Sequence, residues 1–191
     1  MVRPLDAALL PALGALFDGD GTTRGCWCMW FIVPVREYHA AGRDGNRAAF
    51  LDRMDRSPEP FGLVALRDGE AVGWCAAGPR ERYVRAIRTP TFSGRDPAED
   101  GSVWMVPCFF VRRDARGRGV ALALLEAAVS AARAHGAPAI EGFPFAGPAR
   151  RSGGDTQVGV EPLFASCGFA PVRRPSGNRV VMRLELGPVS G

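Results

Sequence analysis

The arginines and glycines of segment 112–121 are the residues with the clearest chemical potential in this sequence. They stand within a few positions of one another: Arg112, Arg113, Arg116, Arg118, Gly117 and Gly119. Apolar residues at helical spacing follow over 121–132, which predicts a helix that ends at His135 and Gly136. The first N–H groups of a helix lack partners within the helix, and the helix dipole is positive there. The segment therefore predicts an anion site that suits a polyphosphate.

A strand is predicted directly before this helix, over 103–111. The segment is dense in aromatic and β-branched residues, which favours a buried strand. Pro107 lies inside it, and proline has no N–H to donate to a neighbouring strand. The sequence therefore predicts a bulge or a local loss of strand pairing near Pro107.

Known phosphate-binding motifs narrow the choice of ligand. A Walker loop requires a lysine after its last glycine, but this chain contains no lysine. A dinucleotide fingerprint requires a third glycine where Leu122 stands. The pattern that fits is R-x-x-G-x-A, formed by Arg116, Gly119 and Ala121. It resembles the pyrophosphate loop of the GNAT acyl-CoA N-acyltransferases, whose pattern is Q/R-x-x-G-x-G/A between a bulged strand and a helix.

A second motif supports this resemblance. The pattern L-F-x-x-x-G-F at 163–169 resembles the last motif of the family, in which a short helix runs into G-F and the final strands. The resemblance covers roughly 61–186, and 1–60 only loosely. It implies an α/β fold with a mixed, mostly antiparallel central sheet, a bulged and splayed central strand, and flanking helices. It also implies a single domain over 1–191, with a helical, substrate-side part at 1–60 and a sheet core with the acetyl-CoA site at 61–186.

The patterns along the chain predict the remaining elements. Helices are predicted over 4–17, 46–56 and 161–167, and strands over 61–66, 70–77, 137–143, 169–174 and 180–186. Segment 18–25 is predicted to be a loop. The aromatic segment 26–33 is predicted to be either a core strand or the wall of a substrate cavity. Segment 145–158, rich in glycine and arginine, is predicted to be a loop.

The resemblance implies an N-acetyltransferase that moves an acetyl group from acetyl-CoA to a primary amine of a small molecule or a protein by direct attack. The pantetheine arm would hydrogen-bond to Phe109 and Val111 as an added strand does. The pyrophosphate would bind backbone N–H groups of 116–121, and an N–H near Cys108 or Phe109 would stabilise the oxyanion. The implied cofactor-binding residues are Phe109, Phe110, Val111, Arg116, Gly117, Arg118, Gly119, Val120 and Ala121.

The general base is predicted to be Glu141. It is the only acidic residue in the two predicted central strands, and an ammonium acceptor must lose a proton before it attacks. A paired structural carboxylate is an equally open interpretation of Glu141. Glu37 and Asp155 are the alternative bases.

The residue at the position of the family's general acid differs from the family pattern. The usual tyrosine falls four residues before the glycine of G-F, where this chain has Phe164. Phenylalanine has no proton to donate, so the departing thiolate would be protonated by another group or by solvent. The remaining candidate acids are Ser166, Cys167, Tyr83 and Tyr38. A nucleophilic role for Cys108 is disfavoured, because nothing near it in the sequence would lower its pKa.

Composition leaves two other classes of function open. A CoA-binding regulatory module without turnover is the main alternative, and Phe164 is its best support. A net charge of +4 and a pI near 9.1 are too mild to indicate a nucleic-acid-binding protein, and no such motif is present. The arginine-rich segment 79–95 is predicted to be a solvated basic surface. The alternative, more specific interpretation is that it binds an acidic substrate or the 3′-phosphate of CoA.

The cysteines do not indicate a disulfide framework or a metal site. Five cysteines is an odd number, and only Cys26 and Cys28 stand close together in the sequence. Segment 18–29 lacks the glycine and the final carboxylate of a calcium loop. No apolar run reaches transmembrane length, and the N-terminus lacks a signal-peptide pattern. We therefore expect a cytoplasmic protein with no membrane or nucleic-acid partner and no metal; a homodimer is expected from the family alone.

Overall fold

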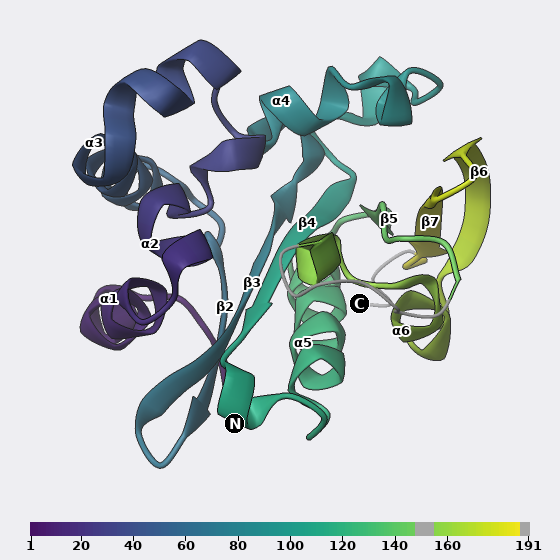
Figure 1. The fold of residues 1–191 in the computed structure, drawn as a ribbon. Helices are drawn as coiled ribbons and strands as arrows, with labels where there is room; N and C mark the ends of the chain where they lie inside the picture. Colours follow the sequence, from purple (N-terminus) through teal and green to yellow (C-terminus); the bar gives the residue numbers. More distant parts are fainter. Residues whose placement is uncertain (148–154, 188–191) are drawn as a thin grey trace.

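The computed structural model describes residues 1–147 and 155–187. Within these residues the chain forms a seven-stranded sheet in the order β1-β2-β3-β4-β5-β7-β6 (Figure 1). The strands are β1 (Val2–Pro4), β2 (Gly62–Arg67), β3 (Glu70–Pro79), β4 (Trp104–Val111), β5 (Ala139–Gly142), β6 (Ala170–Ser176) and β7 (Arg179–Glu185). The α-helices are α1 (Leu10–Asp18), α2 (Gly21–Cys26), α3 (Val35–Asp55), α4 (Val84–Ile87), α5 (Val120–Ala134) and α6 (Glu161–Ser166). The 3-10 turns are η1 (Ala7–Leu9), η2 (Met29–Phe31), η3 (Arg80–Arg82), η4 (Pro90–Phe92), η5 (Pro97–Glu99), η6 (Arg113–Ala115) and η7 (Asp155–Val158).

The sheet is mixed and mostly antiparallel, as predicted. Every pair of neighbouring strands runs antiparallel except β4 and β5, which pair in parallel. Helix α5 packs against β2, β3 and β4 on one face, whereas α1 packs against β3 on the other, with α2 and α3 beyond it (Figure 1). The two faces therefore carry separate hydrophobic cores.

Strand β4 contains the predicted irregularity at Pro107. Between the pairs Ala76–Cys108 and Gly78–Met105, β4 has one residue more than β3, which defines a bulge. β5 pairs only with the first three residues of β4. Beyond Pro107 the two strands separate, so the backbone of β4 is open on the side that β5 would otherwise occupy.

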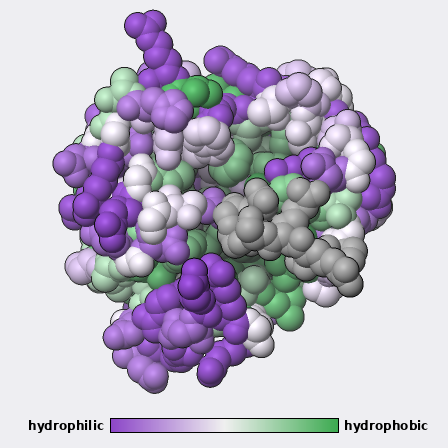
Figure 2. Space-filling model, viewed as in Figure 1, coloured by the Kyte–Doolittle hydropathy of each residue, from purple (hydrophilic) through white to green (hydrophobic). Residues whose placement is uncertain are grey.

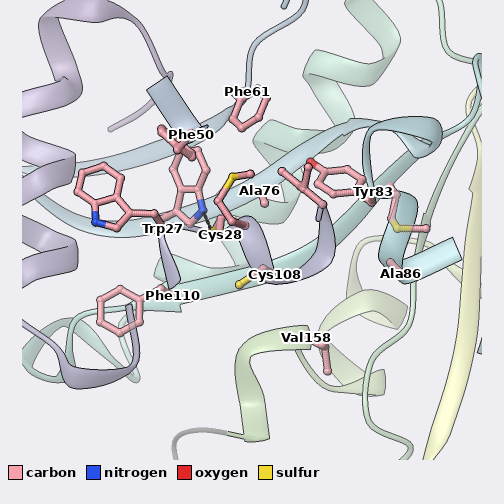
Figure 3. Close-up of a cluster of buried hydrophobic side chains, with 14 of the residues drawn as sticks. Trp27, Cys28, Phe50, Phe61, Ala76, Tyr83, Ala86, Cys108, Phe110 and Val158 are labelled. Atoms are coloured by element: carbon pink, nitrogen blue, oxygen red, sulfur yellow. Dashed lines mark hydrogen bonds between the residues drawn. The ribbon is translucent and has the colours of Figure 1, made fainter. Parts of the chain in front are cut away.

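Aromatic side chains fill the core between the sheet and α1–α3. Phe17, Trp27, Phe50 and Trp74 meet edge to face with ring centroids 5.2–5.9 Å apart. Figure 3 shows this cluster with Cys28, whose Sγ accepts a hydrogen bond of 2.8 Å from the indole N–H of Trp74. The cluster fixes the N-terminal helices against β3.

The N-terminal part differs from the sequence-based expectation. Residues 2–4 form an edge strand on β2, and a helix begins only after them. The predicted loop 18–25 contains α2, because Asp20 caps its first turn through a hydrogen bond from the N–H of Thr22. The predicted helix 46–56 starts earlier, at Val35, with a kink at Gly42, where φ is +58°. The cap at Asp20 explains why the short helix α2 forms. A search for apolar periodicity does not detect such a cap.

Segment 26–33 is not a strand. Trp27 and Cys28 have left-handed backbones, with φ of 43° and 53°, and residues 29–31 form η2. Five residues of the segment are buried: Trp27, Cys28, Met29, Ile32 and Val33. The aromatic density of this segment therefore reflects burial in the core rather than extended conformation.

The C-terminal half follows the prediction closely. α5 ends at Ala134, His135 is its C-cap, and Gly136 has a φ of +71°. β5, α6, β6 and β7 overlap the predicted elements. Part of the predicted loop 145–158 lies outside the described residues. No helix within 1–147 or 155–187 is long and apolar enough to cross a membrane.

Candidate functional site

A cleft of about 370 Å³ lies between the open edge of β4, the start of α5 and segment 157–163. Its lining includes nearly all of the residues predicted to bind the cofactor: Phe109, Phe110, Val111, Arg116, Gly117, Gly119, Val120 and Ala121. Arg118 is the exception, because it lines a separate cavity beside Met1 and Arg67. The fold thus brings the strand and the loop together, while the role of these residues in binding remains a prediction.

The loop before α5 leaves its backbone accessible. Gly117 and Gly119 have φ of +69° and +76°, which favours glycine at both positions. No atom lies within 4 Å of the place where a Cβ would stand on either residue. Gly119 is the N-cap of α5 and provides no side chain to bind the N–H groups of the first turn. These groups are left for an anionic ligand.

The register of β4 decides which backbone groups are open to the cleft. The N–H of Arg112 donates to the carbonyl oxygen of Val72 at 2.9 Å, so alternate residues of β4 bond to β3. Phe109 and Val111 fall between them and direct their backbone groups away from β3. The Nε of Arg116 donates to the carbonyl oxygen of Val111 at 3.0 Å, which ties the loop to the strand.

The opposite wall of the cleft was not predicted from the sequence. It consists of Gln157, Gly159, Val160 and Leu163. Phe145 holds this wall through two backbone bonds: its N–H donates to Gly159 at 3.1 Å, and its carbonyl oxygen accepts from Glu161 at 2.9 Å. The L-F motif at 163–164 is the one signal in the sequence that could have indicated this wall.

The arginines of the loop have different environments. Arg112 is paired with Asp114 at 2.8 Å and with Glu70 at 2.9 Å. The hydrogen bonds that Arg112 donates to these carboxylates raise its pKa, and the Arg112 guanidinium lowers the pKa of Asp114. The other loop arginines form no ion pair with a described residue: Arg113, Arg116 and Arg118. Uncompensated positive charge therefore remains near the start of α5.

Phe164 is part of the core rather than of an accessible acid site. It is fully buried and packs against Phe109 and Phe169, with ring centroids 6.0 and 5.1 Å away. A Cβ on Gly142 would lie 2.2 Å from the Phe164 ring, and one on Gly159 would lie 2.9 Å from it. Two glycines thus make room for this ring.

We expect Gly142→Ala to destabilise the protein by about 1–3 kcal/mol, because the added methyl group would overlap the Phe164 ring. Urea unfolding measures the change. The control is Gly177→Ala, because nothing lies within 4 Å of its Cβ position; we expect a change of less than about 0.5 kcal/mol. Equal unfolding midpoints for the two variants would contradict the proposed packing.

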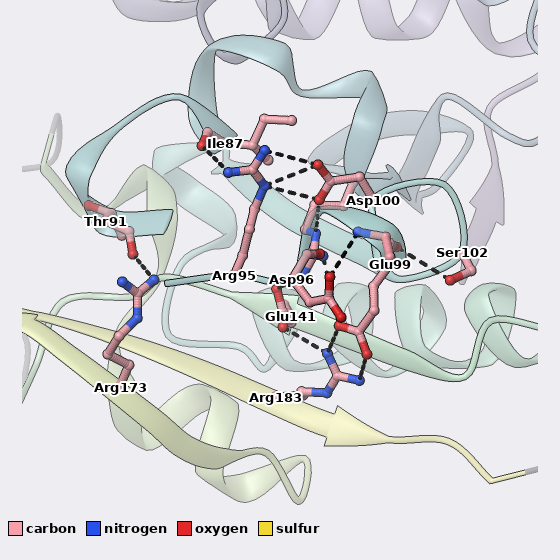
Figure 4. Close-up of polar contacts among 12 residues, drawn as sticks. Ile87, Thr91, Arg95, Asp96, Glu99, Asp100, Ser102, Glu141, Arg173 and Arg183 are labelled. Carbon is pink, nitrogen blue, oxygen red and sulfur yellow. Dashed lines mark hydrogen bonds and ion pairs between the residues drawn. The ribbon is translucent and has the colours of Figure 1, made fainter. Parts of the chain in front are cut away.

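Glu141 is held in a buried ion-pair network (Figure 4). Its Oε2 accepts from Nη1 of Arg80 at 2.9 Å, and its Oε1 accepts from Nη1 of Arg183 at 3.0 Å. Arg80 is fully buried and also bonds Asp100 at 2.7 Å, while Arg183 also pairs with Glu99 at 2.9 Å. Glu141 does not line the cleft. Both of its oxygens are therefore engaged in holding β5 to β7 and to segment 79–102.

Segment 79–95 is not a uniformly solvated basic surface, contrary to the sequence-based expectation. Arg80 is inside the network described above. Arg82 pairs with Glu59 at 3.2 Å, and Arg95 pairs with Asp100 at 3.0 Å. Both carboxylates, Glu59 and Asp100, lie outside segment 79–95. The charge pattern of the segment alone therefore could not reveal these ion pairs.

The five cysteines are free thiols. The neighbouring thiol of Cys108, together with burial, raises the pKa of Cys28, and burial raises the pKa of Cys75. Burial also raises the pKa of Cys26 to about 11. Among the described residues, no group of His, Cys, Asp and Glu could hold a metal ion. The pair Cys26 and Cys28 is therefore packed as small apolar groups.

The alkylation of Cys26 should depend steeply on pH. A thiolate is the reactive form, and a raised pKa means that its fraction grows about tenfold per pH unit up to about pH 10. Labelling with iodoacetamide, followed at the Cys26 peptide by mass spectrometry, measures this profile. The same peptide in urea should reach half of its maximal rate near pH 8.5 and level off about one pH unit higher. A plateau below pH 9 in the folded protein would contradict the burial of this thiol.

Comparison with known proteins agrees with the fold. The sequence model of the acetyltransferase (GNAT) family matches residues 27–144. No curated protein matches this chain. Among solved structures, an N-acetyltransferase from Staphylococcus aureus Mu50 is 18% identical, with a TM-score of 0.59 over 98% of each chain.

Two further solved structures have similar folds. A ribosomal-protein-alanine N-acetyltransferase from Brucella melitensis is 20% identical, with a TM-score of 0.56 over 97% of this chain and 99% of its own. The putative acetyltransferase yncA from Salmonella typhimurium, solved with its cofactor acetyl-CoA, is 16% identical, with a TM-score of 0.57 over 100% of this chain and 96% of its own. At these identities the likeness concerns the fold alone.

Proposed function

Because the chain belongs to the acetyltransferase (GNAT) family, we propose that it transfers an acetyl group from acetyl-CoA to a primary amine by direct attack. One observation carries this proposal: the cleft joins the open edge of β4 to the uncapped start of α5. An extended arm and a pyrophosphate need these two surfaces side by side. Acetyl-CoA supplies an activated thioester there.

Each part of the cleft has a role in this proposal. The backbone groups of Phe109 and the N–H of Val111 bind the pantetheine arm, while the carbonyl oxygen of Val111 accepts from Arg116. The N–H groups of 117–121 bind the pyrophosphate, and Arg113 and Arg116 add attraction for its charge. Arg118 lies on the other side of the loop, so its contribution is limited to long-range attraction.

The acceptor amine must lose a proton during the transfer, and the groups that line the cleft decide which of them could take it. The attacking nitrogen forms a bond to the acyl carbon, the carbon–sulfur bond breaks, and the nitrogen gives up a proton. No described residue that lines the cleft carries a carboxylate. The role of Glu141 as general base stays a prediction, and its two arginine partners favour a structural role instead. We propose that the amine attacks in its neutral form, that solvent takes the proton from the nitrogen, and that solvent returns a proton to the departing thiolate of CoA.

Two measurements test the function. Calorimetric titration with acetyl-CoA should give binding, and CoA release in the presence of an amine panel should depend on the amine. Absence of binding would remove the basis of the proposal. Binding without amine-dependent release would favour the alternative, a CoA-binding module without turnover. That alternative is supported by Phe164 at the usual acid position and by the paired state of Glu141.

A further inference from the structure

Arg85 on α4 is a half-buried arginine with no carboxylate partner among the described residues. Its guanidinium carbon lies 3.4 Å from the centroid of the Trp30 ring, and its Nη1 donates to the carbonyl oxygen of Trp30 at 2.8 Å. Arg80, Arg82 and Arg95 in the same part of the chain all pair with carboxylates. Arg85 is therefore fixed in position while its charge is left uncompensated.

The groups around Arg85 do not neutralise it. Burial lowers the pKa of Arg85, and only Tyr38 and Cys26 oppose this effect. Burial raises the pKa of both Tyr38 and Cys26, so both are neutral near pH 7. A guanidinium remains charged at that pH. Arg85 is only partly withdrawn from water, and the ring and carbonyl oxygen of Trp30 stabilise part of its charge. An anionic ligand would supply the opposite charge that these neutral groups lack.

The surroundings of Arg85 are aromatic and lie near the opening between β4 and β5. α4 packs against η2, and Figure 1 shows α4 beside the segment that joins α2 to α3. Trp30 meets Tyr38 with ring centroids 5.0 Å apart. Phe31, the next residue, meets Phe143 with ring centroids 5.6 Å apart. Phe143 directly follows β5, the strand that separates from β4 at Pro107.

The face that contains this opening has an apolar centre. Figure 2 shows hydrophobic and weakly polar residues in the middle of the face, beside the residues drawn in grey, and strongly hydrophilic residues around the margin. Phe31 is half-buried and can pack against a ligand that enters there, whereas Phe143 is only 7% exposed and packs against Phe31 from the core. One fixed cation, Arg85, therefore lies beside the aromatic residues Trp30 and Tyr38, and Phe31 connects this group to Phe143 at the end of β5.

We propose that Arg85 binds the carboxylate of the acceptor, and that the acceptor is a small amine that carries a carboxylate on an apolar body. This inference rests on the proposed acetyl transfer. The planar guanidinium can pair with both oxygens of a carboxylate, while Phe31 contacts the apolar part. The amine is then directed to the open edge of β4, where the thioester would lie.

The test compares amino acids with their amides. The probes are L-phenylalanine, L-methionine and 6-aminohexanoate, each paired with its carboxamide, and the readout is CoA release from acetyl-CoA. We expect kcat/KM to be at least about tenfold higher for an acid than for its amide, since a charge-assisted pair contributes about 1.5–3 kcal/mol. Arg85→Met should raise KM for the acid and abolish the preference, while the rate with the amide stays unchanged.

Two matched variants separate recognition from folding. Arg85→Lys keeps the charge but not the planar fork, so it should restore part of the preference. Arg88→Met changes an exposed arginine at the end of the same helix and should leave the preference intact. Thermal melting and calorimetric titration with acetyl-CoA are run on every variant.

The outcomes distinguish this inference from the function on which it rests. Failure of the wild type to bind acetyl-CoA would overturn the proposed function. If acetyl-CoA binds normally, any of three results would overturn the present inference alone: amides react as well as acids, Arg85→Met keeps the preference, or the amides are acetylated while no probe acid is. A preference that is lost in Arg85→Met, partly restored in Arg85→Lys and kept in Arg88→Met would support it.

Discussion

Replacing Gly119 with glutamate should weaken acetyl-CoA binding by at least about 100-fold, which corresponds to about 2.7 kcal/mol. The carboxylate would stand at the N-cap of α5, where the N–H groups of the first turn are left for a phosphate. It would occupy space that is open in this structure and repel the pyrophosphate, and like charges in contact cost several kcal/mol. Calorimetric titration with acetyl-CoA measures the loss.

The matched control is Gly119→Asn. Asparagine tolerates the left-handed backbone of Gly119 better than other side chains, and it is neutral. Both variants change the same backbone position, so the difference in their acetyl-CoA affinity isolates the charge. Glutamate and asparagine variants that bind equally well would show that the pyrophosphate does not lie at the start of α5.

Replacing Glu141 with glutamine should lower the free energy of unfolding by about 3 kcal/mol. The substitution keeps the shape but removes the charge that faces Arg80 and Arg183, and the side chains of Arg80 and Glu141 are only 1% and 7% exposed. If Glu141 is structural, kcat of the folded fraction should change little. Urea unfolding and CoA-release assays on the same preparation measure both quantities.

A general base would give the opposite pattern. Loss of such a group lowers kcat by about 10²–10⁴-fold, with a smaller effect on unfolding. Glu185→Gln is the control, since Glu185 also pairs with Arg183 but its side chain is 70% exposed. We expect Glu185→Gln to cost no more than about 1 kcal/mol. A large fall in kcat at unchanged stability in Glu141→Gln would restore the base assignment.

The sequence alone determined the elements around the cleft between β4 and α5. Pro107 predicted the bulge, and the glycines and arginines of 116–119 predicted the turn into α5. These features depend on local backbone chemistry: a missing N–H, a left-handed φ and the start of a helix. Most of the lining of the cleft was predicted for the same reason, because strand, loop and helix are contiguous in the chain.

Only the tertiary structure decided what the charged and aromatic residues do. The sequence separation between Glu141 and its arginine partners is 61 residues for Arg80 and 42 for Arg183, so the strand pattern could not show that both oxygens are engaged. In the sequence, Arg85 was equivalent to Arg82 and Arg95, but the fold pairs those two with carboxylates and places Arg85 against Trp30. Periodicity and propensity act over a few residues, whereas burial and ion pairing depend on which distant segments meet.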